Sequence, residues 1–100
     1  MPEFKKAAAK SEIGPGTGKA VDMDGQTIAL FNVDGNFYAL SNTCAHRGGP
    51  LGEGGLSGKE VTCPWHGWSY DVTSGNATHT AASVKTYPVK VEGENILVSI

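Results

Sequence analysis

Short strand-like segments separated by glycine turns are the feature that most limits what this chain can fold into. Fourteen of its 100 residues are glycine, and the runs between them are rich in Val, Ile, Thr, Phe and Tyr, which favour strands. Asp-Gly pairs at 24–25 and 34–35 separate the first runs and suit the type I′ turns of antiparallel hairpins. We therefore predict a three-stranded meander, formed by Lys19–Met23, Gln26–Val33 and Phe37–Leu40.

The C-terminal part of the chain repeats this pattern. Tyr87–Val91 and Ile96–Ile100 flank the polar run Glu92–Asn95, and their alternating apolar residues predict a hairpin with one buried face. Further short strands are expected at Lys59–Cys63, at Trp68–Val72 and, at a sheet edge, at Phe4–Ala8. Ala7–Lys10 suits the start of a helical turn equally well. The predicted fold class is all-β, in one antiparallel domain over residues 1–100.

Composition narrows the class of protein. Hydrophobic residues make up 39% and charged residues 18% of the chain, with a formal charge of −2, which suits one modest core. No basic stripe of the kind that binds nucleic acid is visible, and no apolar run is long enough to span a bilayer. No apolar stretch follows the lysines of Met1–Lys10, as a secretory signal would require. We expect a cytoplasmic protein whose thiols are reduced.

Residues 42–58 interrupt the strand pattern with six glycines and a proline in seventeen positions. A loop of this length in a compact domain is typically functional or disordered, and this one holds Cys44 and His46. A second pair, Cys63 and His66, begins after sixteen intervening residues. Two cysteines and two histidines suit a tetrahedral zinc ion or an iron–sulfur centre. Zinc fits less well, because Cys2His2 zinc sites pair cysteine with cysteine at a wider spacing.

The residues around these pairs strongly resemble a known family. Cys44–Gly54 and Cys63–Asp71 resemble the two cluster loops of the Rieske [2Fe–2S] family, and the flanking hairpins fit its small antiparallel fold. The resemblance implies a β-sandwich in which the loops, at about 42–54 and 62–71, form an inserted subdomain. It also implies that Cys44 and Cys63 bind one iron of a single [2Fe–2S] cluster, and that His46 and His66 bind the other iron.

The charge of such a cluster predicts its chemistry. Two ferric ions, two sulfides and two thiolates sum to zero, and neutral imidazoles add nothing. Because an electron enters a neutral centre more easily than an anionic one, histidine ligation raises the reduction potential above that of an all-cysteine cluster. The electron localises on the histidine-bound iron, so His46 and His66 are the expected exit route. The chain is expected to be an electron carrier and not an enzyme.

The residues beside the ligands are candidates for supporting roles. Glycines let backbone N–H groups approach sulfur closely, prolines stiffen the loops, tryptophans pack or exclude water, and an arginine beside the outer ligand suits partner docking. These candidates are Arg47, Gly48, Gly49, Pro50, Pro64, Trp65, Gly67, Trp68 and Tyr70.

Some positions at which this chain departs from the family pattern affect the expected reduction potential of the cluster. Gly49 and Trp65 stand where Rieske proteins of respiratory and photosynthetic membrane complexes carry two further cysteines. Trp68 stands where they carry a serine that donates to a sulfide, whereas Tyr70 matches their tyrosine. Fewer hydrogen bonds to sulfur lower the potential, so we expect the lower part of the Rieske range. Thr80–Ala82 also lie where a proline often shapes a third segment that covers the cluster.

Length and terminal hairpin resemble the stand-alone Rieske ferredoxins that serve bacterial ring-hydroxylating oxygenases. That resemblance implies a flavin-dependent ferredoxin reductase upstream and a terminal oxygenase downstream, with a monomeric carrier between them. Three alternatives stay open: a Rieske-type small subunit of a larger reductase such as nitrite reductase, a zinc-binding interaction module, and an iron–sulfur sensor.

Overall fold

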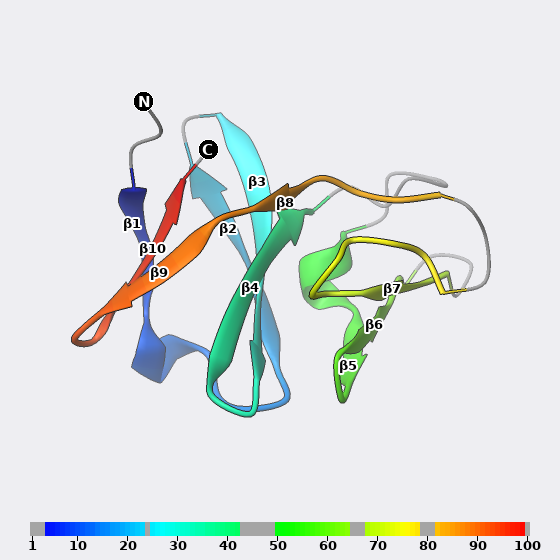
Figure 1. Ribbon diagram of the computed structural model, residues 1–100, viewed down its shortest axis with the longest axis horizontal. Helices are drawn as coiled ribbons and strands as arrows, with labels where there is room; N and C mark the ends of the chain where they lie inside the picture. The colour runs from blue at the N-terminus through cyan, green and yellow to red at the C-terminus, as the bar shows by residue number, and fades with distance from the viewer. Residues whose placement is uncertain (1–3, 24, 43–49, 65–67, 79–81, 100) are drawn as a thin grey trace.

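The structure is a computed structural model that describes residues 4–23, 25–42, 50–64, 68–78 and 82–99. Strands are the main secondary structure of the described part of the chain (Figure 1). Its strands are β1 Phe4–Ala9, β2 Gly18–Met23, β3 Gln26–Val33, β4 Asn36–Ser41, β5 Gly55–Ser57, β6 Glu60–Thr62, β7 Ser69–Asp71, β8 Thr86–Tyr87, β9 Val89–Glu92 and β10 Asn95–Ser99. Two single-turn 3-10 helices complete it, η1 at Lys10–Glu12 and η2 at Leu51–Glu53.

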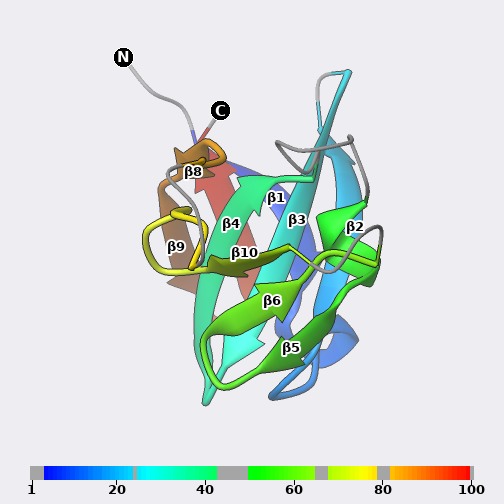
Figure 2. The same ribbon diagram turned by 90° about the vertical axis from the view of Figure 1, so that its right-hand side faces the viewer.

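The strands form three antiparallel sheets. The first has the order β2-β3-β4-β8, the second β1-β10-β9 and the third β5-β6-β7. In Figure 1 the second sheet lies to the left of the first and the third sheet to its right. Figure 2 shows the third sheet in front of the first. The all-β antiparallel class predicted from the sequence is confirmed.

The central strand β3 is buried on both faces. Its run Ile28-Ala29-Leu30-Phe31 is fully buried, because each face of the first sheet is covered by another layer. Ile28 and Leu30 belong to a core shared with the second sheet, where Ile96 and Val98 of β10 meet them. Ala29 and Phe31 belong to a second core that includes Val61 of β6 and Tyr70 of β7. The third sheet therefore packs against the first sheet through this second core.

The predicted meander is confirmed as β2, β3 and β4. Asp34 and Gly35 both have positive φ, at 52° and 90°, as a type I′ turn requires, and Met23 pairs with Gln26 across the first turn. The predicted edge strand is β1, which pairs only with β10. The helical alternative for Ala7–Lys10 is wrong for its first three residues, which belong to β1, and the 3-10 turn η1 begins only at Lys10.

The predicted strand Tyr87–Val91 is wrong as a single element. Pro88 divides it into β8, which pairs with β4 in the first sheet, and β9, which pairs with β10 in the second. Proline has no N–H to donate to a ladder, so the chain changes sheets there. The short strand β5 lies inside the segment that the sequence marked as a loop. It was not predicted because Gly55 and Ser57 have little strand propensity.

Among the described residues, none lies in a helix long and apolar enough to cross a membrane.

Gly75 gives a direct test of backbone packing beside the third sheet. It has φ 80°, and a Cβ there would overlap the carbonyl oxygen of Val84 and lie 2.8 Å from Cγ2 of Thr86. We expect Gly75→Ala to lower the free energy of unfolding by about 3 kcal/mol or more, since it combines left-handed strain with a backbone clash. Chemical denaturation measures this.

The matched control is Gly58→Ala. Gly58 also has a positive φ, at 61°, but a Cβ there would meet nothing within 4 Å. Conformational strain alone predicts a loss of about 1 kcal/mol. Equal losses for the two variants would show that the approach of Gly75 to Val84 does not matter.

Candidate metal centre

Cys63 lies in the second core, at the point where β6 ends. Its side chain is 1% exposed and belongs to the same buried cluster as Leu51 and Tyr70. The backbone N–H of Cys63 donates to the carbonyl of Trp68 over 2.7 Å. Cys63 and Trp68, which follow β6 and precede β7, are therefore hydrogen-bonded to each other.

The first predicted loop is closed in a similar way at Asn42. The N–H of Leu51 donates to the Asn42 carbonyl over 2.8 Å, and the N–H of Gly52 donates to the Asn42 side-chain oxygen over 2.6 Å. Leu51 is fully buried in the second core. The loop thus returns to the scaffold at a fixed point beside the strand from which it departed.

The bases of the two loops lie side by side. Gly55 pairs with Thr62 in the β5–β6 ladder, and a Cβ on Gly54 would overlap the Thr62 carbonyl oxygen. The Thr62 and Ser69 hydroxyl oxygens lie 3.1 Å apart across the β6–β7 ladder. The residue that follows the first loop therefore lies against the residue that precedes Cys63.

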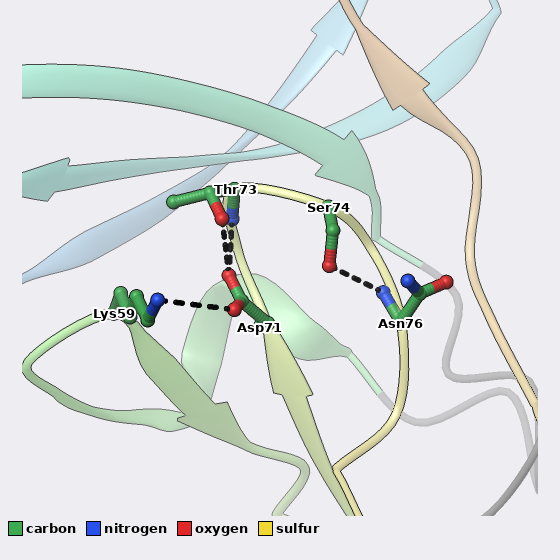
Figure 3. Close-up of polar contacts among 5 residues, drawn as sticks. All are labelled: Lys59, Asp71, Thr73, Ser74 and Asn76. Carbon is green, nitrogen blue, oxygen red and sulfur yellow. Dashed lines mark hydrogen bonds and ion pairs between the residues drawn. The ribbon is translucent and has the colours of Figure 1, made fainter.

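A polar network fixes the far end of β7 (Figure 3). The Asp71 carboxylate accepts hydrogen bonds from the Thr73 hydroxyl at 2.5 Å and from the Thr73 N–H at 2.8 Å, and Lys59 Nζ lies 3.6 Å away. The Asp71 N–H donates to the Asn76 carbonyl over 2.9 Å, and the Asn76 N–H donates to the Ser74 hydroxyl. The network folds residues 72–76 back against the strand that holds Tyr70.

The described part of the chain includes five of the predicted site residues. Cys63 and Tyr70 are buried together, Trp68 is half-buried and packs against the same core, Pro50 is half-buried, and Pro64 is exposed. The other predicted site residues lie outside the described ranges: Cys44, His46, Arg47, Gly48, Gly49, Trp65, His66 and Gly67.

Sequence reasoning missed the residues that hold the loop bases. Asn42, Gly52 and Gly54 make or permit the contacts described above, and Asp71 organises the turn after β7. A signal was present for Asp71, because an Asp side chain commonly accepts the backbone N–H two residues further on. No such signal was present for Asn42, whose side-chain partner Gly52 lies ten residues away. The tight approaches of Gly52 and Gly54 depend on long-range packing that no local pattern encodes.

This arrangement fits an iron–sulfur cluster. Thiolate sulfur is a soft ligand suited to iron–sulfur centres, and the buried Cys63 presents such a sulfur from a backbone fixed at both ends of its loop. Among the described residues, no group of three or more His, Cys, Asp or Glu side chains gathers to hold a metal ion.

Comparisons with known proteins assign the family. The model of the Rieske [2Fe-2S] domain matches residues 3–92. The ferredoxin component of the naphthalene 1,2-dioxygenase system of Pseudomonas aeruginosa is 36% identical over 94% of this chain and 92% of its own length. A chain in a structure described as a complex of reduced oxygenase and oxidized ferredoxin in carbazole 1,9a-dioxygenase superposes with a TM-score of 0.88 at 30% identity, covering 96% of this chain and 92% of that one.

A structure from Mycobacterium tuberculosis, described as a putative NADH-dependent nitrite reductase small subunit, has a TM-score of 0.91 at 26% identity, covering 100% of this chain and 96% of that one. The chain belongs to the Rieske [2Fe–2S] domain family. It binds one Rieske-type [2Fe–2S] cluster and is an electron carrier of the ferredoxin type, not a catalytic subunit.

The Asp71 network predicts a dependence of stability on acid. The Thr73 hydroxyl is the largest cause that holds the pKa of Asp71 below its ordinary value, with smaller contributions from the Thr73 N–H and Lys59, against a partial rise from burial. Because the folded-state pKa is the lower one, the network stabilises the fold fully above the unfolded-state value of about 3.9. This stabilisation is lost as the pH falls through the folded-state pKa.

We expect Asp71→Asn to flatten the fall of unfolding free energy between about pH 5 and pH 2.5. Thr73→Val, which removes the hydroxyl donor and keeps the carboxylate, should give an intermediate slope. Urea denaturation at a series of pH values measures both. Three identical slopes would show that Asp71 does not couple folding to protonation.

Proposed function

We propose that this chain carries single electrons from a flavin-dependent ferredoxin reductase to the terminal oxygenase of a bacterial ring-hydroxylating system, in the cytoplasm. The observation that carries the proposal is the similarity over nearly the full length of both chains to the naphthalene dioxygenase ferredoxin component. The carbazole dioxygenase complex supports the choice of partner, because a chain of the same fold is there joined to an oxygenase. Residues 1–100 act as one Rieske domain in this proposal.

The proposed ligands are Cys44 and Cys63 for one iron and His46 and His66 for the other. Burial of Cys63 in the second core and the fixed bases of both loops support this assignment. The bound cluster supplies a one-electron centre of neutral charge in its oxidised form. The two histidines form the proposed exit towards a partner.

The protein's own residues have a supporting part in this function. The second core surrounds Cys63 with Leu51, Val61 and Tyr70, which keeps water from the thiolate side of the centre. The half-buried Trp68 extends this cover towards the surface. A serine donor in place of Trp68 would raise the potential, so this chain suits delivery of electrons at low potential.

A second candidate is the small subunit of a nitrite reductase. The fold of the Mycobacterium tuberculosis protein covers the whole of this chain, and fold similarity alone does not separate the two roles. Reconstitution separates them: the first proposal expects transfer of electrons from a naphthalene-type reductase to its oxygenase through this chain. Stable co-purification with a large haem-containing reductase subunit, without such transfer, would favour the second.

Ligand substitution tests the site. Freshly purified protein should contain about two irons and two sulfides per chain and be bleached by dithionite. We expect Cys44→Ser, Cys63→Ser, His46→Ala and His66→Ala each to lose most of this iron and the visible absorbance. His79→Ala is the matched histidine control and should keep both. A variant of a proposed ligand with the full iron content would remove that residue from the set, and stoichiometric zinc without iron would establish the interaction module.

The potential gives an independent test. Rieske centres span about −150 to +300 mV, and we expect this one near the lower limit because Trp68 replaces a hydroxyl donor. Trp68→Ser should raise the midpoint potential, measured by protein-film voltammetry. A wild-type value near the upper limit would contradict the account of the hydrogen bonds around sulfur.

A further inference from the structure

Asn42, the residue that follows β4, is hydrogen-bonded both to β3 and to the segment that begins at Leu51. Its N–H donates to the carbonyl of Thr27 over 3.1 Å, and its own carbonyl accepts the N–H of Leu51 over 2.8 Å. Its side-chain oxygen accepts the N–H of Gly52 over 2.6 Å. Asn42 therefore connects the end of β4, the start of β3 and the start of η2 through hydrogen bonds.

The packing around Gly52 leaves no room for a side chain. A Cβ on Gly52 would lie 2.8 Å from the backbone nitrogen of Ala20, 2.9 Å from its Cα and 2.9 Å from the Asn42 side-chain oxygen. Gly52 is buried, and the neighbouring Leu51 is fully buried in the second core. Gly52 therefore packs against Ala20 of β2 and is hydrogen-bonded to the Asn42 side-chain oxygen.

We propose that Asn42 is a positioning residue for the cluster, because its hydrogen bonds fix Asn42 relative to Leu51 and Gly52, and these residues flank positions 43–50. The inference rests on the proposed function, because it takes Cys44 and His46 as ligands carried by this segment. The expected effect is on conformational entropy. When the two flanking residues are fixed relative to each other, fewer conformations compete with the one that binds iron. Without the amide oxygen, the buried Gly52 N–H lacks its acceptor, and the base opens more readily.

The chain contains a matched comparison at Asn32. The Asn32 side-chain oxygen also accepts a glycine N–H, that of Gly35, over 2.7 Å, and its side-chain NH2 group donates to the Ile13 carbonyl over 2.8 Å. This contact closes the β3–β4 turn, at the other end of β4 from Asn42. Asn32 is also the more buried of the two. Its loss should therefore destabilise the fold at least as much, without touching the base of the first loop.

The experiment measures cluster release from the purified holoprotein, with excess EDTA as the iron acceptor and visible absorbance as the readout. We expect Asn42→Ala to release its cluster about tenfold faster than wild type, with a changed EPR spectrum of the reduced form. Asn42→Asp keeps an acceptor oxygen and should restore the release rate to within about twofold. Asn32→Ala should lower the thermal midpoint while keeping the wild-type EPR spectrum and release rate.

Several outcomes would overturn the proposal. Equal acceleration in Asn42→Ala and Asn32→Ala would assign the effect to general stability, and a wild-type release rate in Asn42→Ala would remove the positioning role. Asn42→Leu, similar in volume to asparagine but without an acceptor, replaces Asn42→Ala if that variant fails to fold. Cys44→Ser is measured in parallel: a retained cluster there overturns the ligand assignment itself, whereas a lost cluster beside a wild-type Asn42→Ala overturns only the positioning role.

Discussion

The burial of β3 on both faces is the constraint on which the rest of the molecule depends. Four successive residues, Ile28 to Phe31, are removed from water, and burial of each large side chain among them contributes about 1.5–3 kcal/mol. Alternate side chains supply two separate cores. The second sheet closes one core, and the small third sheet closes the other. The same central strand thus supplies side chains both to the core of the scaffold and to the core that contains Cys63.

The second core joins the scaffold to the site. Phe31 and Leu40 come from the first sheet, Leu51 from η2, Cys63 from the residue after β6, and Tyr70 from β7. Packing these side chains together sets the positions from which both loops depart. The packing around Phe31 is close, because a Cβ on Gly18 would lie 2.5 Å from the Phe31 ring. Fixed loop bases of this kind suit a carrier whose centre must keep one geometry in two oxidation states.

Local chemistry explains which parts of the fold were predictable. Asp34-Gly35 specifies its turn through backbone conformation alone, and the apolar run of β3 marks a strand buried on both faces. The resemblance of Cys44–Gly54 and Cys63–Asp71 to the Rieske cluster loops indicated the kind of centre, because the two Cys-His pairs alone left zinc open. Pro88 was visible in the sequence, but the change of sheet that it causes depends on which strands compete for Tyr87 and Val89. The roles of Asn42 and Gly52 depend on contacts across ten or more residues, which spacing does not reveal.

The central claim is that a cluster with two histidine ligands is held on this β-scaffold. Pulsed EPR of the dithionite-reduced holoprotein, labelled with 15N-histidine, tests it most directly, since only directly coordinated nitrogens couple strongly to the unpaired electron. The account predicts two strongly coupled histidine nitrogens in wild type and one in a single-histidine variant that retains some cluster. A reduced cluster with no coupled histidine nitrogen, or with one in wild type, would contradict it.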